Sequence, residues 1–424
     1  MAMPGLGGLG RNFGLLWAAN SVSTLGDGVV AAAAPLLVAS VSDDPVLVGL
    51  AVFVQQLPWL LFSLVSGVVI DRLDKQRLIV AVDLLRGGLT ALLAVTVWSG
   101  DASIPVIYAI AFLLGTGETL AENAAATMVP AVVAPDALPS ANSRLHGSYF
   151  VLNKFAGRPL GAALFVAAAA LPFGVDASSF VASALLVAMM RGVRSGAAAP
   201  AGGADEGQRP SVRADIAVGV RWLWHEPTIR TMAVALCLMN VTLTSGFSIL
   251  VLYARDRLGI GDIGFGLLLS ASAVGGVFGA MWAPRLQSRF RAATLLRVGL
   301  IVETCTHVGL ALSSLAWVSA AVLVVFGVHS SVFAGVETTI RQRRVPEALR
   351  GRVQSVFMML AIGGNALGAL LGGPLARWRG VTAPFWFAAA AMAVVTAMAW
   401  APFGRNLASG PASPHNPHLA KVGA

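Results

Sequence analysis

The sequence predicts an all-α membrane protein with twelve transmembrane helices in two six-helix bundles related by pseudo-twofold symmetry. Three observations predict this fold: the composition, the spacing of the apolar segments, and the alternation of Lys and Arg between them. Of the 424 residues, 57% are hydrophobic and only 12% are charged, whereas a soluble domain carries about 25% charged residues. The polar residues fall mainly in short segments between long apolar ones, as expected for a chain whose helices face lipid.

A helix that crosses a bilayer needs about 20 mostly apolar residues. Twelve segments of the chain meet this requirement. They lie at 13–40, 46–70, 78–99, 104–129, 141–170, 172–190, 229–254, 263–284, 293–313, 316–340, 351–376 and 381–403.

The composition divides the chain into four regions. Residues 1–190 form the first predicted bundle, and residues 228–403 form the second. Residues 191–227 form a cytoplasmic linker, which starts with an Ala- and Gly-rich flexible stretch and ends in a short amphipathic helix from Ser211. Residues 404–424 are polar and Pro-rich, and we expect a disordered cytoplasmic tail.

Lys and Arg alternate between the two ends of the predicted helices. With both termini on one side, 22 of the 29 basic residues lie on that side, four lie on the other, and three fall inside helices. Because cytoplasmic loops are enriched in Lys and Arg, both termini are predicted to be cytoplasmic. Such an orientation requires an even number of spans.

An internal repeat supports the two bundles. Pro135-Asp-Ala-Leu precedes the fifth segment, and Pro346-Glu-Ala-Leu precedes the eleventh, 211 residues later. Gly157 and Gly161 have counterparts at the same offset, and Gly67 has one at a similar offset. Parallel repeats of this kind place a binding site between the halves, near the middle of the bilayer.

Composition also excludes several classes of function. The net charge of +9 is spread between apolar segments and does not form one basic face, so nucleic acid is not a predicted partner. The two cysteines have no metal-ligand spacing, and no Walker A motif is present. No nucleophile has a base at a usable spacing. We therefore expect no enzyme activity, no cofactor and no bound metal.

The loop after the second segment carries a recognisable motif. It reads Gly67-Val-Val-Ile-Asp71-Arg72-Leu-Asp-Lys75-Gln-Arg77. This resembles the Gly-x-x-x-Asp-Arg-x-Gly-Arg-Arg loop of the major facilitator superfamily, with Asp74 in place of a glycine. In that superfamily, the loop takes part in the conformational change.

Four further stretches resemble one branch of the superfamily, which contains enterobactin exporters and macrolide efflux proteins. They are residues 12–27, Asp176-Ala-Ser-Ser-Phe, Trp222-Leu-Trp-His-Glu-Pro227 and residues 345–353. The resemblance implies export from the cytoplasm coupled to proton entry, by alternating access of the two halves. It also implies that Asp27 is a functional acid in the first helix.

Charged side chains are costly in the bilayer, so each one inside a predicted span is expected to have a partner or a function. Asp27 is either a carboxylate for a proton or a cationic substrate, or a hydrogen-bond acceptor in helix packing. Glu118 and Glu122 share one face of the fourth helix, and their repulsion favours protonation of one of them. Glu118 is the deeper of the two and is the second proton-coupling candidate.

Other polar residues in the spans are candidates for a substrate cavity. Lys154 and Arg158 share one face of the fifth helix, where they either neutralise Glu118 or Asp27 or form a basic patch for an acidic substrate. The remaining cavity candidates are the amides of Asn20, Asn240 and Asn365, although Asn240 and Asn365 could equally bond neighbouring helices.

Several charged residues are expected to form structural pairs. Asp83 and Arg86 lie three positions apart on one helix face, and Glu303 and His307 lie four apart on another. Glu122 is expected to pair with an arginine at the cytoplasmic end such as Arg72. Glu337 is expected to pair with the arginines that follow it.

The resulting hypothesis is a proton-coupled exporter of a drug, an antibiotic or a siderophore-like compound. Its partners are a small-molecule substrate, protons and the lipid bilayer, and we expect a monomer in the inner membrane of a bacterium. One alternative is a proton-coupled nutrient importer with the same fold. The other is a membrane receptor that transports nothing.

Overall fold

The computed structural model describes residues 9–192 and 212–408. These residues form helices joined by short connections, and none of them lies in a strand. The prediction of an all-α chain is therefore confirmed for the described part.

The described residues of the first half form seven α-helices, and a π-helix lies between the fifth and the sixth. Their bounds are α1 Gly10–Val41, α2 Pro45–Arg72, α3 Lys75–Ser99, α4 Ile104–Val132, α5 Leu138–Ser148, the π-helix Tyr149–Gly157, α6 Arg158–Ala167 and α7 Leu171–Ala188. The second half comprises α8 Val212–His225, α9 Pro227–Phe247, α10 Leu250–Asp256, α11 Asp262–Arg289, α12 Ala292–Leu312, α13 Ala316–Arg344, α14 Arg350–Arg379 and α15 Ala383–Ala408. Short 3₁₀ turns at Pro135–Ala137 and Glu347–Leu349 precede α5 and α14.

Eleven helices in the described ranges are long and apolar enough to cross a membrane. The fifth predicted span, residues 141–170, is not among them, because it is divided into three shorter helices: α5, the π-helix and α6. Pro159 is the second residue of α6 and has no backbone N–H, so the α-helical bond to Phe155 cannot form. The wider turns of the π-helix end at Gly157, two residues before this proline. The count of twelve spans stays a prediction.

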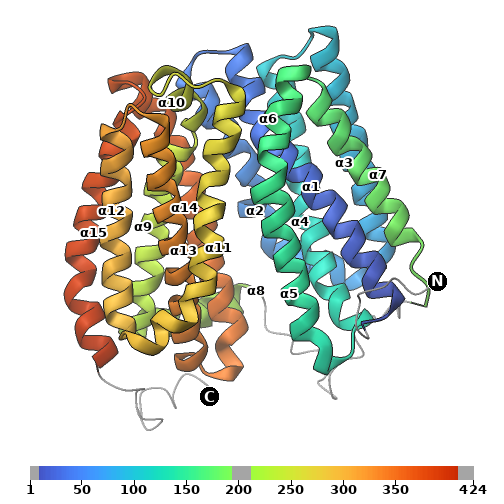
Figure 1. Ribbon diagram of the computed structural model, residues 1–424. Helices are drawn as coiled ribbons and strands as arrows, with labels where there is room; N and C mark the ends of the chain where they lie inside the picture. Colours follow the sequence, from blue (N-terminus) through green and yellow to red (C-terminus); the bar gives the residue numbers. More distant parts are fainter. Residues whose placement is uncertain (1–8, 193–211, 409–424) are drawn as a thin grey trace.

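Figure 1 shows the helices in two groups that stand side by side, α1–α7 in one and α9–α15 in the other. The α5–α6 segment faces α11 of the other group, and α2 packs along α14. At the lower end of this view, α1 begins and α15 ends, and α8 lies beside α14.

Small residues allow close packing inside each group. A Cβ on Gly157 would lie 2.8 Å from the Cα of Gly28, and a Cβ on Gly161 would overlap the backbone of Val29. In the second group, a Cβ on Gly368 would lie 3.0 Å from the Cβ of Thr244. These positions therefore bring α1 against the α5–α6 segment, and α9 against α14, at backbone contact.

The two groups are joined at the upper end of Figure 1. Arg255, which follows α9, forms an ion pair of 2.9 Å with Asp43, and Arg377 of α14 lies 3.6 Å from Asp44. Nearby, a Cβ on Gly49 of α2 would lie 3.1 Å from the backbone nitrogen of Gly373 on α14. The halves are thus in direct contact at this end.

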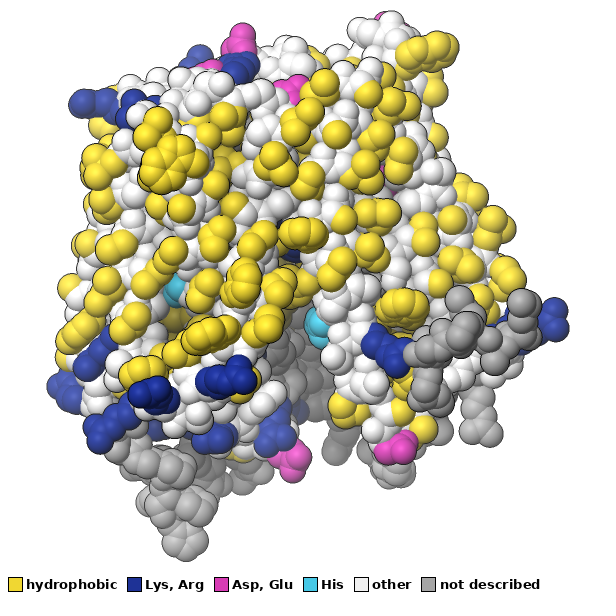
Figure 2. All heavy atoms as spheres, in the orientation of Figure 1, with side chains coloured by type: hydrophobic (Ala, Val, Ile, Leu, Met, Phe, Trp, Pro, Cys, Tyr) yellow, Lys and Arg dark blue, Asp and Glu magenta, His cyan; other side chains and the backbone are white. Residues whose placement is uncertain are grey.

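The surface follows the charge pattern of the sequence. In Figure 2, hydrophobic side chains cover the middle of the molecule, and many Lys and Arg side chains gather at the lower end below α9–α15.

Candidate substrate cavity

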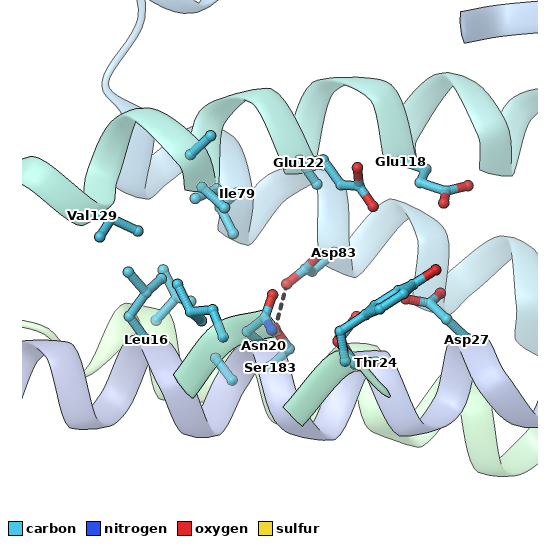
Figure 3. A pocket seen from close by; sticks show the side chains of 18 of the residues that line it. Leu16, Asn20, Thr24, Asp27, Ile79, Asp83, Glu118, Glu122, Val129 and Ser183 are labelled. Carbon is cyan, nitrogen blue, oxygen red and sulfur yellow. Dashed lines mark hydrogen bonds between the residues drawn. The ribbon is translucent and has the colours of Figure 1, made fainter. Parts of the chain in front are cut away.

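A cavity of about 530 Å³ lies within the first half of the molecule. Its walls come from α1, α3, α4, α5, the π-helix and α7, and Figure 3 shows the side chains that line it. The polar lining residues are Asn20, Ser23, Thr24, Asp27, Asp83, Arg86, Glu118, Glu122, Asn142, His146, Tyr149, Asn153 and Ser183. The internal repeat predicted a site between the halves, whereas the residues that line this cavity belong to the first half.

An ion pair between α1 and α3 crosses this cavity. Arg86 donates from Nη2 to Oδ1 of Asp27 at 3.0 Å. The guanidinium also lies 4.1 Å from the ring centroid of Phe180, and a Cβ on Gly117 would lie 2.9 Å from its Cγ. The arginine is thus held on three sides, while the Asp27 side chain keeps 34% of its surface exposed. Of the two partners, only Asp27 can readily meet a ligand.

Asp83 was expected to pair with Arg86, but the structure gives the two residues different partners. Asp83 accepts a hydrogen bond of 2.7 Å from the hydroxyl of Ser183 on α7, which Figure 3 draws as a dashed line. Arg86 instead reaches across to Asp27 on α1. Three-residue spacing places the two side chains on one face, but contacts with α1 and α7 decide where each one points.

The carboxylates of α4 complete the acidic wall. Glu118 and Glu122 point from α4 into the space that Asp27 and Asp83 border from the other side. Among the described residues, the lining thus contains four carboxylates and one guanidinium. With every group ionised and His146 neutral, the lining would carry three net negative charges. Such a cavity attracts protons and cations.

The two basic residues of the fifth predicted span do not line this cavity. Lys154 lies with its ammonium 5.3 Å from the ring centroid of Tyr149. Arg158 donates to the carbonyl oxygen of Leu269 on α11 at 3.1 Å, which is a bond between the two halves. The structure therefore places Asn20 in the lining. Lys154 is not a lining residue, but it contacts the lining residue Tyr149 and interacts electrostatically with Glu118, whereas Arg158 bonds to the other half.

The polar candidates of the second half lie apart from the main cavity. Asn240 and Glu337 line a smaller cavity of about 120 Å³ between α9 and α13. Asn365 accepts a hydrogen bond of 2.9 Å from Thr244, so its amide joins α14 to α9. Glu337 pairs with Arg341, one turn later on α13. Glu303 contacts His307 as expected, and it also contacts His329.

The motif between α2 and α3 is only partly visible. Gly67, Asp71 and Arg72 belong to α2, but the burial and side-chain contacts of this part of the helix are outside what the structure describes. The expected pair between Arg72 and Glu122 therefore stays a prediction. Lys75 begins α3, and the exposed Arg77 lies in its first turn. Asp74, where the superfamily motif has glycine, accepts a bond of 2.9 Å from the backbone N–H of Arg77 and so caps α3.

Asp176, beside the cavity, and Asn153, in its lining, are buried polar residues that were not among the predicted site residues. Asp176 on α7 is 2% exposed, packs against Gly26 and accepts from the hydroxyl of Ser179. Asn153 of the π-helix is 7% exposed and donates to the carbonyl oxygen of Thr24 at 3.4 Å. The position of Asp176 inside an apolar segment was the signal that could have marked it as a site residue.

Comparison with known proteins gives concordant results. Residues 10–417 match the family described as transmembrane secretion effector. The multidrug efflux pump Tap of Mycolicibacterium fortuitum is 27% identical over 369 residues, which are 85% of this chain and 88% of that protein. The enterobactin exporter EntS of Shigella boydii is 24% identical over 374 residues, with 85% and 84% covered.

Solved structures share the fold. A bacterial homologue of the iron transporter ferroportin in its inward-facing state superimposes with a TM-score of 0.73 at 17% identity, over 93% of this chain and 99% of that one. The outward-facing state of that homologue gives a TM-score of 0.60 at 18% identity, over 94% and 100%. The family match spans nearly the whole described chain, and the relatives are covered along most of their length. The chain belongs to the transmembrane secretion effector family and is a multi-pass transporter of the major facilitator superfamily.

Proposed function

We propose that the protein exports a cationic or partly apolar small molecule, such as a drug or an antibiotic, in exchange for protons. The observation that carries this proposal is the cavity with four carboxylates and one arginine in its lining. Its volume of about 530 Å³ lies within the range of ligand pockets, roughly 300–1,000 Å³. Relatives named as a multidrug efflux pump and an enterobactin exporter support export over import.

The proposed orientation places the lower end of Figure 1 in the cytoplasm of a bacterial inner membrane. The gathering of Lys and Arg at this end supports it. The halves touch at the opposite end through Asp43, Asp44 and their arginine partners. The structure would then be open to the cytoplasm, and the higher TM-score with the inward-facing ferroportin homologue agrees with this state.

In the proposed cycle, protons and substrate compete for the same carboxylates. Asp27 is paired with Arg86 in the described state and is partly exposed to the cavity. A proton on Asp27 removes its negative charge and weakens the pair, whereas a bound organic cation needs the carboxylates ionised. Glu118 lies in the same wall and offers a second proton acceptor. Exchange of one ligand for the other would couple export to proton entry.

The moving parts in this proposal are the two bundles, residues 1–190 and 228–403, which would rock about their contact as a monomer. The α5–α6 segment against α11, and α2 against α14, form the contacts along which the motion would occur. Residues 191–227 would connect the bundles on the cytoplasmic side, with α8 held against α14.

Transport in inverted membrane vesicles tests the proposal. A fluorescent organic cation should accumulate when a proton gradient acidifies the vesicle interior, and dissipation of the gradient should stop it. Asp27→Asn should abolish accumulation, and Glu118→Gln should reduce it. Asp101→Asn is the matched control, because Asp101 is exposed in the connection after α3. Unchanged proton-driven accumulation by Asp27→Asn would remove Asp27 from the mechanism.

The importer alternative makes the opposite prediction for direction. Uptake into right-side-out vesicles driven by an inward proton gradient would support import and contradict export. The receptor alternative does not agree with membership of a transporter family.

A further inference from the structure

A cluster of three ionisable side chains is buried in the second half of the molecule, away from the acidic cavity. Glu303 and His307 lie on α12, and His329 lies on α13. Their exposed fractions are 1%, 0% and 8%, respectively. His329 Nε2 lies 2.8 Å from Glu303 Oε2, and His307 Nε2 lies 3.5 Å from Glu303 Oε1. One carboxylate therefore stands between two imidazoles.

The contact with Glu303 determines where His329 can take up a proton. At 2.8 Å from a carboxylate oxygen, Nε2 must carry a hydrogen and donate it. In neutral imidazole the other nitrogen, Nδ1, is then an acceptor, and it has no hydrogen-bond partner among the described residues. A Cβ on Gly299 would lie only 3.1 Å from Nδ1, so the glycine lets α12 pack closely beside this buried nitrogen. His307 likewise has no hydrogen-bond partner at either ring nitrogen within the described part of the chain.

The charge of the cluster favours uptake of one proton. With both imidazoles neutral, the buried cluster carries one negative charge. One added proton makes a carboxylate–imidazolium pair with no net charge, which costs less to bury than an unpaired ion. A second proton would create a buried positive charge, so the cluster is suited to hold a single proton.

Neighbouring charges in the described part of the chain do not supply an alternative partner. From α13, Glu337 lines the same small cavity but pairs with Arg341 of its own helix. From α9, the cavity receives only the amide of Asn240 and apolar side chains. On α12, Arg297 bonds the carbonyl oxygen of Trp400 on α15, and near the cluster α15 contributes the hydroxyl of Thr396. The proton is thus the cation that would balance Glu303.

We propose that Glu303, His307 and His329 form a proton-binding site in the second half of the transporter, filled from the small cavity between α9 and α13. A hydrated proton from this cavity adds to the Nδ1 lone pair of His329 and forms an N–H bond, and no other bond changes. Glu303 and His329 both line this cavity, which is therefore the side from which the proton would reach the cluster. This site is separate from Asp27 and Glu118, and would give the second half a titratable group of its own.

Nitrogen NMR of the full-length protein in lipid bilayers tests this site directly. ¹⁵N-labelled histidine distinguishes imidazolium from neutral imidazole, and the chain has six histidines. His307→Gln and His329→Gln identify the signals of the cluster. Across a pH range from acidic to basic, one histidine of the cluster should be detected as imidazolium at the acidic end and as neutral imidazole at the basic end. The measurement uses no substrate, so its failure would leave the proposed export untouched.

Two variants separate proton binding from a structural role. Glu303→Gln should eliminate the imidazolium signal of the cluster throughout this pH range, whereas Glu303→Asp should retain it. Glu337→Gln is the matched control, because Glu337 lines the same cavity but pairs with Arg341, and it should leave the titration unchanged. Neutral cluster histidines at every pH in the unmodified protein would overturn the proposal. An imidazolium that persists in folded Glu303→Gln would also overturn it.

Discussion

Replacement of Arg86 by methionine should destabilise the first half of the transporter. The side chain is 7% exposed, contacts the Phe180 ring and pairs with Asp27 at 3.0 Å. Methionine preserves much of the apolar contact with the ring but removes the charge. The carboxylate of Asp27 then lacks its partner, in a cavity wall that already holds three other carboxylates.

The size of the effect follows from distance and exposure. At 3.0 Å and an effective dielectric constant of about 20, the attraction between the two charges is about 5 kcal/mol before desolvation. Removal of one partner from a fully buried pair costs roughly 3–5 kcal/mol. Because 34% of the Asp27 side chain is exposed, water compensates part of this loss, and we expect about 2 kcal/mol.

Unfolding of the purified protein in mixed micelles measures this cost, and a double-mutant cycle isolates the pair. Arg86→Met and Asp27→Asn should each destabilise the protein, and the double variant should lose less than their sum by about 1–2 kcal/mol. This coupling should shrink as the pH falls, since protonation of Asp27 removes its charge. A coupling energy below about 0.5 kcal/mol at neutral pH would show that the pair is not ionised in solution, and the proposed competition at Asp27 would fail.

Two further predictions concern packing and the contact between the halves. Gly161→Ala should lower the free energy of unfolding by about 1–3 kcal/mol, because the added Cβ would overlap the backbone of Val29. Gly174→Ala is the control and should not lower it, because no atom lies within 4 Å of the added Cβ. Equal effects of the two variants in thermal unfolding would contradict the backbone contact at Gly161. Arg255→Gln should change the free energy of unfolding by less than about 1 kcal/mol, because the side chains of Arg255 and Asp43 are 46% and 85% exposed. A larger loss of stability that persists at high salt would contradict this interpretation.

The composition of the sequence was enough to locate most of the helices. Apolar segments of about 20 residues identify spans because lipid cannot bond a backbone, so the length and polarity of each segment largely decide its structure. This reasoning failed to divide residues 141–170. Pro159 was visible in the sequence, but the π-helix that precedes it and the close contact between Gly28 and Gly157 are features of the tertiary structure.

The candidate site was predictable only as a set of residues. Intramembrane charge marked Asp27, Asp83, Arg86, Glu118 and Glu122, because an ion in an apolar segment is expensive whatever the fold. Their grouping in one cavity depends on how α1, α3 and α4 are rotated about their axes.

Choice of partner also depended on the tertiary structure. Spacing along one helix paired Glu303 with His307, but could not bring in His329 from α13. Spacing also grouped Lys154 with Arg158, whereas packing turned Arg158 toward α11 and away from the carboxylates. The sequence by itself determined that the chain spans a membrane and where its costly charges lie, because both depend on local composition. Only the tertiary structure decided which charges meet, because side-chain direction is set by packing between helices.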